Sequence, residues 1–233
     1  MDGVAILIPA YEPDAALAEL VPQLKSHFEH VVVVDDGSSR GSEVFDGLRV
    51  LVDTVLRHEV NRGKGAALKT GFAWIREHLP EVRTVVTVDA DGQHRLADVL
   101  KVAAASLGHS DGLTLGVREF AGEVPFRSRL GNVWTRVLFR LLTGLAVRDT
   151  QTGLRGIPRG LFARMGEIPG DRYEYELRML VDARSHAAPP LQIPIETVYL
   201  EGNGSSHYRP LRDTFRTQWA LWSSVFRFKG FAK

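Results

Sequence analysis

The sequence predicts an α/β fold in which helices cover both faces of a doubly wound, mainly parallel sheet. Short runs rich in valine, isoleucine and leucine alternate with longer segments whose apolar residues recur at helical spacing. The short runs are apolar at successive positions, which is typical of strands that are buried on both faces. At 233 residues, the chain is long enough to bury a substantial core.

The first half of the chain supplies five predicted strands and the helices between them. Each strand candidate is a β-rich apolar run, and turn-forming residues separate it from a segment of helical periodicity. In chain order, the strands are 4–8, 31–34, 54–58, 84–88 and 111–117, and the helices are 14–28, 63–79 and 95–107.

The second half mixes long helical patterns with one further strand. A long helix carrying several arginines is predicted first, then a turn-rich segment, a helix, a strand and a closing helix. These are 127–145, the irregular stretch "DTQTGLRGIPRG" at 149–160, 173–186, 191–200 and 212–228. We expect residues 1–211 to form one domain and residues 212–233 an amphipathic appendage.

Composition excludes several classes of protein. The formal net charge of +1 gives no overall field that would attract nucleic acid, so we expect no nucleic-acid partner. The absence of cysteine excludes disulfides, thiolate zinc sites and cysteine nucleophiles. The first residues lack the features of a signal peptide, and no apolar run approaches the roughly 18 to 20 residues that cross a bilayer.

Four polar clusters follow four of the predicted strands. They are "PAYEP" at 9–13, "DDGS" at 35–38, "NRGKG" at 61–65 and "DADGQH" at 89–94. Each cluster alone could be an ordinary polar turn. Because ligands of open α/β sheets bind outside the carboxyl ends of the strands, four clusters at that edge predict a binding site.

The stretch "DADGQH" has the residues of a divalent-metal site. Asp89 and Asp91 are two apart, so at the end of a strand both carboxylates can face one cleft. Two such charges repel each other unless a cation lies beside them, and Mg²⁺ or Mn²⁺ prefers oxygen ligands. Gln93 would add an amide oxygen, whereas His94 is the least certain member. A polar turn with surplus carboxylates is the alternative.

The stretch "NRGKGAALKTG" fits neither common nucleotide-binding fingerprint. The P-loop pattern is absent, and Leu68 stands where the dinucleotide fingerprint wants a glycine or alanine after Gly63 and Gly65. A glycine turn that opens a helix remains, with Lys64 near its N-terminus, and this arrangement favours an anionic ligand. The alternative is a helix start with a solvated lysine.

Five motifs together resemble a known family. "VAILIPAYEP", "VVVVDDGSS", "NRGKGAALKTG", "VDADGQH" and "DTQTGLRG" occur in the order found in family 2 inverting glycosyltransferases of the GT-A fold. The resemblance runs from Val4 to about Arg212. It is nearest to the polyprenyl-phosphate sugar transferases, such as dolichyl-phosphate mannose synthase and undecaprenyl-phosphate glucosyltransferase.

The resemblance implies a donor, a metal and roles for particular residues. The donor would be a GDP- or UDP-hexose, and the cofactor Mg²⁺ or Mn²⁺ held by Asp89, Asp91 and Gln93. "DTQTGLRG" would form the floor on the acceptor side. The nucleotide-sugar pocket would comprise Pro9, Ala10, Tyr11, Glu12, Asp36, Gly63, Lys64, Asp89 and Ala90.

The acceptor decides what other chemistry the site needs. A sugar hydroxyl needs a general base, for which Asp149 is the candidate. A polyprenyl phosphate is already ionised and needs cations instead, preferably arginines. Arg118, Arg127, Arg129, His207 and Arg209 are the candidate phosphate ligands, and the catalytic candidates are Asp91, Asp149, Arg118 and Arg129. Surface ion pairs are the alternative role for the arginines.

The last predicted helix carries an aromatic stripe. Phe215, Trp219, Trp222 and Phe226 fall at i, i+4, i+7 and i+11, with basic residues around them. Such a helix can lie in a membrane interface, or it can pack onto the domain. We therefore expect a peripheral protein at the cytoplasmic face of a membrane, with room for a membrane-spanning partner subunit. A non-catalytic nucleotide-sugar-binding module is the remaining alternative.

Overall fold

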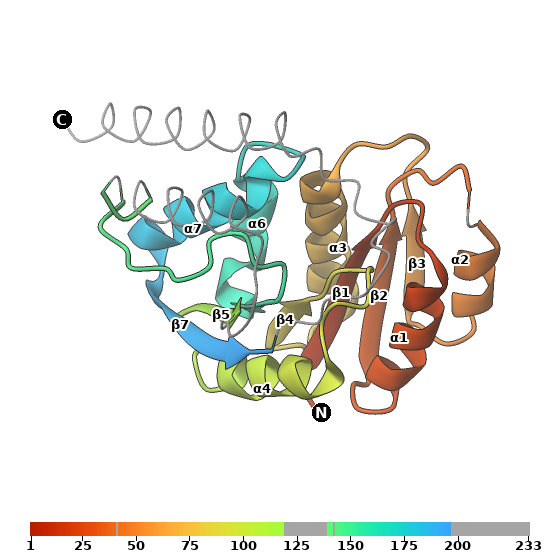
Figure 1. The fold of residues 1–233 in the computed structure, drawn as a ribbon, viewed down its shortest axis with the longest axis horizontal. Helices are drawn as coiled ribbons and strands as arrows, with labels where there is room; N and C mark the ends of the chain where they lie inside the picture. The colour runs from red at the N-terminus through yellow and green to blue at the C-terminus, as the bar shows by residue number, and fades with distance from the viewer. Residues whose placement is uncertain (41, 119–138, 142, 197–233) are drawn as a thin grey trace.

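The computed structural model describes residues 1–40, 42–118, 139–141 and 143–196 (Figure 1). The expected domain boundary at residues 211 and 212, the appendage at 212–233 and most of the helix at 127–145 lie outside these residues. The same holds for four candidate phosphate ligands, Arg127, Arg129, His207 and Arg209.

In the described residues, a seven-stranded sheet in the order β3-β2-β1-β4-β6-β5-β7 forms the centre of the fold. Among these strands only β6 runs antiparallel to its neighbours, so the mixed, mainly parallel sheet confirms the predicted fold class. The strands are β1 (Val4–Ala10), β2 (His30–Asp35), β3 (Thr54–Arg57), β4 (Thr84–Thr87), β5 (Gly112–Arg118), β6 (Arg155–Pro158) and β7 (Ala188–Ile195).

Strand β6 corrects the sequence analysis, because it lies within the segment 149–160 that was predicted to be irregular. Its four residues "RGIP" carry two turn-favouring residues and no clear periodicity. They become a strand because β4 and β5 offer their backbone edges on either side, with Val86 opposite Gly156 and Thr114 opposite Gly156. Context of this kind regularly overrides local strand preference.

Helices cover both faces of the sheet, as predicted. Four of them agree with the expected segments, whereas the short helices α2 and α6 were not predicted. The helices are α1 (Ala15–Lys25), α2 (Ser42–Leu48), α3 (Lys64–His78), α4 (Leu96–Leu107), α6 (Phe162–Glu167) and α7 (Glu174–His186), with a 3₁₀ turn, η1, at Arg159–Leu161.

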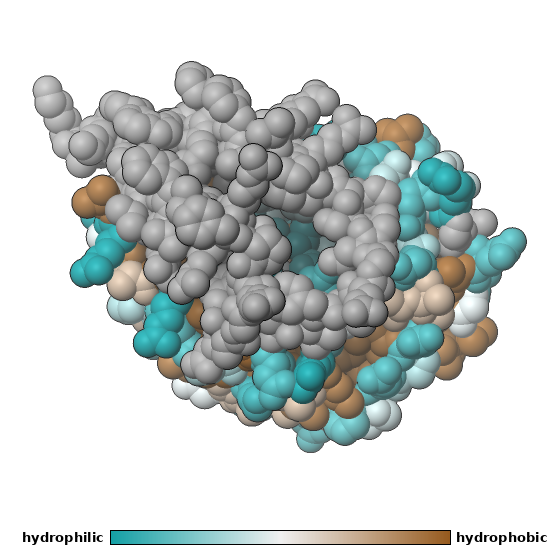
Figure 2. Space-filling view, in the orientation of Figure 1, coloured by the Kyte–Doolittle hydropathy of each residue, from teal (hydrophilic) through white to brown (hydrophobic). Residues whose placement is uncertain are grey.

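The core is divided by the sheet into two apolar clusters. Alternate residues of β1 enter opposite clusters: Ala5 and Leu7 pack with α3, α6 and α7, and Ile6 and Ile8 pack with α1, α2 and α4. This arrangement explains why the strand runs are apolar at every position. No helix in the described residues has the length and apolar character needed to cross a membrane. Hydrophilic and hydrophobic residues are interspersed over the described surface near α1, α2 and α4 (Figure 2).

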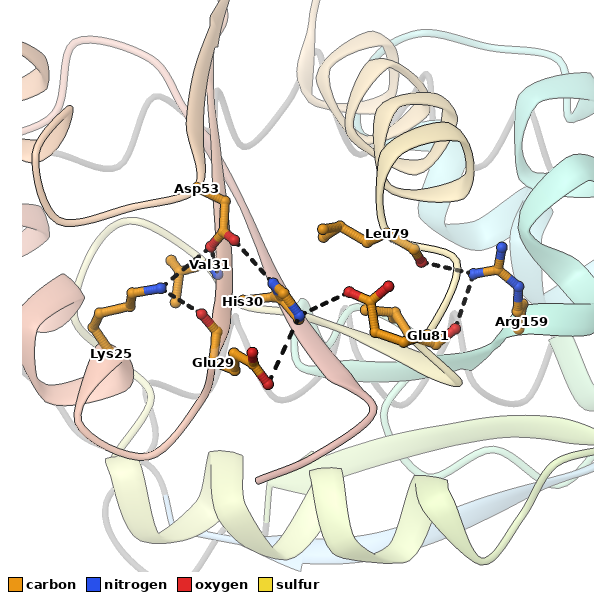
Figure 3. A network of polar contacts seen from close by, with 9 residues as sticks. Lys25, Glu29, His30, Val31, Asp53, Leu79, Glu81 and Arg159 are labelled. Carbon is orange, nitrogen blue, oxygen red and sulfur yellow. Dashed lines mark hydrogen bonds and ion pairs between the residues drawn. The ribbon is translucent and has the colours of Figure 1, made fainter.

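A polar network joins the amino ends of the parallel strands, at the edge opposite the predicted site (Figure 3). Nδ1 of His30 lies 2.8 Å from Asp53 Oδ1, and Nε2 lies 2.9 Å from Glu81 Oε1. Asp53 also accepts a 2.7 Å hydrogen bond from the backbone N–H of Val31 and pairs with Lys25. These contacts connect the start of β2 to the segments that lead into β3 and β4.

Asp53 should make the stability of the fold depend on pH. Burial alone would raise the pKa of Asp53, but the hydrogen bonds from His30 and Val31 hold it below the ordinary value of 3.8. Its stabilising effect is therefore complete above about pH 5 and is lost as the pH falls through the folded-state pKa. Asp53→Asn should lower the free energy of unfolding by about 1–2 kcal/mol at neutral pH, and the deficit should shrink in acid.

Urea unfolding at a series of pH values measures this deficit. The matched control is Asp46→Asn, because Asp46 lies on the surface of α2 and its side chain is 75% exposed. The free energy of unfolding of the control should differ from that of the wild type by no more than about 0.5 kcal/mol at any pH. A deficit for Asp53→Asn that stays constant into acid would contradict the assignment.

Candidate active site

The candidate site lies where the carboxyl ends of β1, β2 and β4 meet the amino end of β6. Because β6 is reversed, the segment before it, residues 149–154, arrives at the same edge as the residues that follow β4. Thr87 is paired with Arg155 in the sheet, and Thr87 Oγ1 donates a 2.7 Å hydrogen bond to the carbonyl of Gly153. Contacts between their residues bring together all four predicted polar clusters and "DTQTGLRG".

Asp89 is held by groups of the protein itself. Its Oδ1 lies 2.7 Å from Lys64 Nζ, and its Oδ2 lies 3.6 Å from His94 Nε2. Burial alone would raise the pKa of Asp89, but the Lys64 ammonium and His94 hold it well below its usual range. Gly153 packs so closely that a Cβ at this position would lie 2.2 Å from Asp89 Oδ2. Asp89 is therefore fixed and charged.

Asp91 has no such cation. Among the described residues it has no ion pair, and its Oδ1 accepts a 3.0 Å hydrogen bond from the backbone N–H of Gln93. Burial first, and the negative charge of Asp89 second, raise the pKa of Asp91. A cation beside Asp91 would relieve both effects.

These residues fit a divalent metal ion of the Mg²⁺ type. Carboxylate and amide oxygens suit such an ion, and Nε2 of His94 is buried nearby without a hydrogen-bond partner in the described part of the chain. Within the same residues, no three His, Cys, Asp or Glu side chains form a complete metal cage. Mg²⁺ is usually bound through one or two carboxylates together with the phosphates of a substrate, so such a cage is not required.

Asp36, a predicted nucleotide-pocket residue, anchors the loop that leads into α3. It is 3% exposed, and its carboxylate accepts hydrogen bonds from the backbone N–H groups of Arg62 and Gly63 at 2.9 and 2.7 Å. His58 Nδ1 lies 2.7 Å from the same carboxylate, and His58 Nε2 lies 2.9 Å from Thr70 Oγ1. Asp36 of "DDGS", the cluster after β2, thereby fixes the backbone of "NRGKG", the cluster after β3.

The four pocket candidates at the end of β1 and just after it differ in burial, and the side chain of Glu12 is only 10% exposed. Pro9 and Ala10 belong to β1 and are buried in the sheet. Tyr11 is 37% exposed. Glu12 adopts a positive φ of 47°, and its carboxylate accepts hydrogen bonds from the backbone N–H groups of Ser39 and Arg40 at 2.9 Å each. Ala90, the last pocket candidate, is partly buried and packs against the apolar cluster that includes α1, α2 and α4.

Arg118 and Asp149, both predicted catalytic candidates, bind each other. Arg118 ends β5, and its Nε and Nη2 donate to the two carboxylate oxygens of Asp149 at 2.6 and 3.2 Å. Asp149 is 1% exposed and also accepts a 3.1 Å hydrogen bond from the backbone N–H of Gln151. Both oxygens of Asp149 are therefore engaged by the protein.

The glycines of "NRGKG" allow α3 to begin against the segment that leads into α7. The helix starts at Lys64, one residue later than predicted, after Gly63 at a positive φ of 108°. A Cβ on Gly63 would lie 2.3 Å from the carbonyl oxygen of Asp171, and one on Gly65 would lie 2.5 Å from Tyr175 Cβ. Only glycine fits this approach, which brings the first turn of α7 to Lys64.

Two site residues were not identified from the sequence as members of the donor site. Glu176 Oε1 lies 3.0 Å from Lys64 Nζ, and Arg155 is 1% exposed and donates to three backbone carbonyls. Arg155 stood within "DTQTGLRG" without a role of its own. Glu176 carried no motif signal, because its neighbours in the site are distant in sequence.

Comparison with known proteins decides the family. Residues 5–165 match the family model described as glycosyl transferase family 2. The chain belongs to that family. An uncharacterized protein of Methanocaldococcus jannaschii is 32% identical to this glycosyltransferase over 207 residues, which cover 86% of the chain and 83% of the relative.

Two named relatives and one solved structure complete the comparison. A UDP-N-acetylglucosamine–dolichyl-phosphate N-acetylglucosaminyltransferase of Methanococcus voltae is 28% identical, with 85% of this chain and 86% of the relative covered. A polyprenol monophosphomannose synthase of Mycolicibacterium smegmatis is 25% identical, with 82% and 75% covered. The fold resembles glucosyl-3-phosphoglycerate synthase of Mycobacterium tuberculosis, crystallised with Mn²⁺ and UDP, at a TM-score of 0.73 and 18% identity, with 97% and 80% covered.

The contact between α3 and α7 predicts an unusual effect of alanine at Gly65. Alanine in a helix normally stabilises by up to about 1 kcal/mol relative to glycine. At Gly65 the added Cβ would meet Tyr175 Cβ at 2.5 Å, so Gly65→Ala should lower the free energy of unfolding by about 1–3 kcal/mol. Chemical denaturation measures the change.

Gly47→Ala in α2 is the matched control. A Cβ at this helical glycine meets nothing within 4 Å, so the variant should be neutral or slightly more stable than wild type. If Gly65→Ala and Gly47→Ala stabilise the protein equally, α3 and α7 do not approach each other as closely as described.

Proposed function

We propose that this glycosyltransferase moves a hexose from a nucleoside-diphosphate sugar, GDP- or UDP-linked, to a polyprenyl phosphate, with inversion at the anomeric carbon. The named relatives from Methanococcus voltae and Mycolicibacterium smegmatis support a dolichyl or other polyprenyl phosphate as the acceptor. We further propose that the reaction takes place on a membrane surface, at its cytoplasmic face, with room for a membrane-spanning partner subunit.

The state of Asp149 is the observation that carries this proposal. A hydroxyl acceptor needs a general base, and Asp149 was the candidate for that role. Its two oxygens are instead engaged by Arg118 in a forked ion pair, in which the carboxylate is buried and the arginine is partly exposed. A lipid phosphate is already ionised and needs no base, so it suits a site whose carboxylate serves to orient an arginine.

The donor side supplies the complementary chemistry. Breaking the anomeric bond leaves negative charge on the nucleoside diphosphate. The Lys64 ammonium lies at the edge where a diphosphate would bind, and burial alone would lower its pKa, but the Asp89 and Glu176 carboxylates raise it above the ordinary value. Lys64 therefore remains charged. Asp91 and Gln93, with Asp89, would hold Mg²⁺ or Mn²⁺, which would neutralise the leaving diphosphate.

Metal removal tests the donor side. A chelator should abolish sugar transfer, and added Mn²⁺ or Mg²⁺ should restore it. Asp91→Asn should lower transfer by at least about 100-fold and should weaken Mn²⁺ binding in the presence of nucleoside diphosphate, as measured by calorimetry. The control Asp46→Asn, on the surface of α2, should change neither sugar transfer nor Mn²⁺ binding. Normal metal binding by Asp91→Asn would refute the role of Asp91.

The acceptor is tested by offering short-chain polyprenyl phosphate and free sugars to the same protein. Labelled sugar should enter the organic phase. Asp149→Asn should raise the KM for the lipid phosphate about tenfold through loss of the Arg118 orientation, while the pH profile of transfer stays the same. If Asp149 is a base for a hydroxyl acceptor, the same variant should lose about 10²–10⁴ in kcat and label should appear on free sugars.

A further inference from the structure

Glu176 stands at the centre of a buried polar cluster that no sequence motif indicated. It lies in the first turn of α7 and is 6% exposed. Its Oε1 lies 3.0 Å from Lys64 Nζ, and the same ammonium lies 2.7 Å from Asp89 Oδ1. The lysine is thus held between a residue that follows β4 and a residue of a distant helix.

The backbone around Glu176 is fixed from two sides. Arg155 Nη1 donates a 2.5 Å hydrogen bond to the carbonyl of Glu176, and Arg155 Nε donates a 2.8 Å bond to the carbonyl of Thr152. On the other side, the backbone N–H of Ala66 donates to the carbonyl of Asp171 at 3.0 Å. The first turn of α7 is therefore tied both to the segment before β6 and to the start of α3.

This arrangement restricts a side chain that is otherwise flexible. A lysine has a long unbranched stem, and fixing its ammonium in one place costs conformational entropy. Asp89 and Glu176 hold the ammonium before any ligand binds. The entropy is therefore lost during folding and not during ligand binding. A preorganised cation binds an anionic ligand more tightly than a mobile one.

The charges around Glu176 explain how its carboxylate can lie in a site for an anionic donor. Lys64 contacts its carboxylate, and the guanidinium of Arg155, which donates to its backbone carbonyl, adds a second positive charge that interacts with it. The glycines at 63 and 65, where a Cβ would collide with the segment before α7, keep this contact short.

We propose that Glu176 is a positioning residue of the donor site: its carboxylate holds the Lys64 ammonium beside Asp89, ready to bind the diphosphate of a nucleoside-diphosphate sugar. The inference rests on the proposed function and adds α7 to the donor site. Glu176 acts through Lys64 and does not itself touch the donor, so its effect on binding must depend on the presence of that lysine.

A double-mutant cycle tests this dependence. Donor affinity is measured by calorimetry with GDP- and UDP-hexoses and Mn²⁺ for wild type, Glu176→Gln, Lys64→Met and the double variant. Glu176→Gln should weaken donor binding about tenfold and raise the donor KM similarly, while kcat at saturating donor stays within about twofold. In the Lys64→Met background, the same change should have no further effect on donor affinity.

Glu174→Gln is the matched control, because Glu174 lies in the same helical turn and its carboxylate faces the backbone N–H of Arg172 at 3.4 Å. It should leave donor affinity unchanged. Melting temperatures without ligand show whether each variant is folded, and if Glu176→Gln does not fold, Glu176→Asp takes its place in the cycle. An equal loss of affinity in both backgrounds, or an equal loss from Glu174→Gln, would overturn the inference.

The same measurements separate the two proposals. A wild-type protein that binds none of the nucleoside-diphosphate sugars contradicts the proposed function and the donor role of Lys64 with it. A wild-type protein that binds a donor, together with a Glu176→Gln variant that binds it equally well, contradicts only the role of Glu176.

Discussion

The Lys64 ammonium, held between Asp89 and Glu176, is the interaction on which the rest of the site depends. Carboxylates gathered at one edge of a sheet repel one another, and burial makes each uncompensated charge more costly. Lys64 balances two of them at 2.7 and 3.0 Å. Asp91 makes no ion pair in the described part of the chain, and burial and the charge of Asp89 raise its pKa, so a metal ion beside Asp91 would be stabilising.

The central part of the sheet was largely predictable because β1, β2, β4 and β5 are buried on both faces, and their residues are therefore mostly apolar. The run of valines in β2 is the clearest case, since all six residues of the strand are buried. Strand β6 was not predictable in this way. Its glycine and proline are poor strand formers, and it exists because β4 and β5 offer their backbone edges on either side of it.

The site was predictable only where its residues are neighbours in the chain. "DADGQH" predicts its own carboxylate pair, and the carboxyl-edge rule brings the separate clusters together. The partners of these groups could not be predicted. Glu176 reaches Lys64, and Arg118 reaches Asp149, only through tertiary packing. The glycines of "NRGKG" suggested a ligand, and the structure adds that they admit the segment before α7.

The reversed direction of β6 decides where this protein can accept changes in length. Because β4 and β6 are antiparallel, the segment before β6 lies beside Asp89. The turn after β6 lies at the opposite edge of the sheet, where Arg159 donates to the carbonyls of Leu79 and Val82. One added residue between 149 and 154 would shift Gly153 away from Asp89 and replace it with a side chain. The fold should therefore tolerate natural insertions and engineered loops near the turn after β6, but not in the segment before β6.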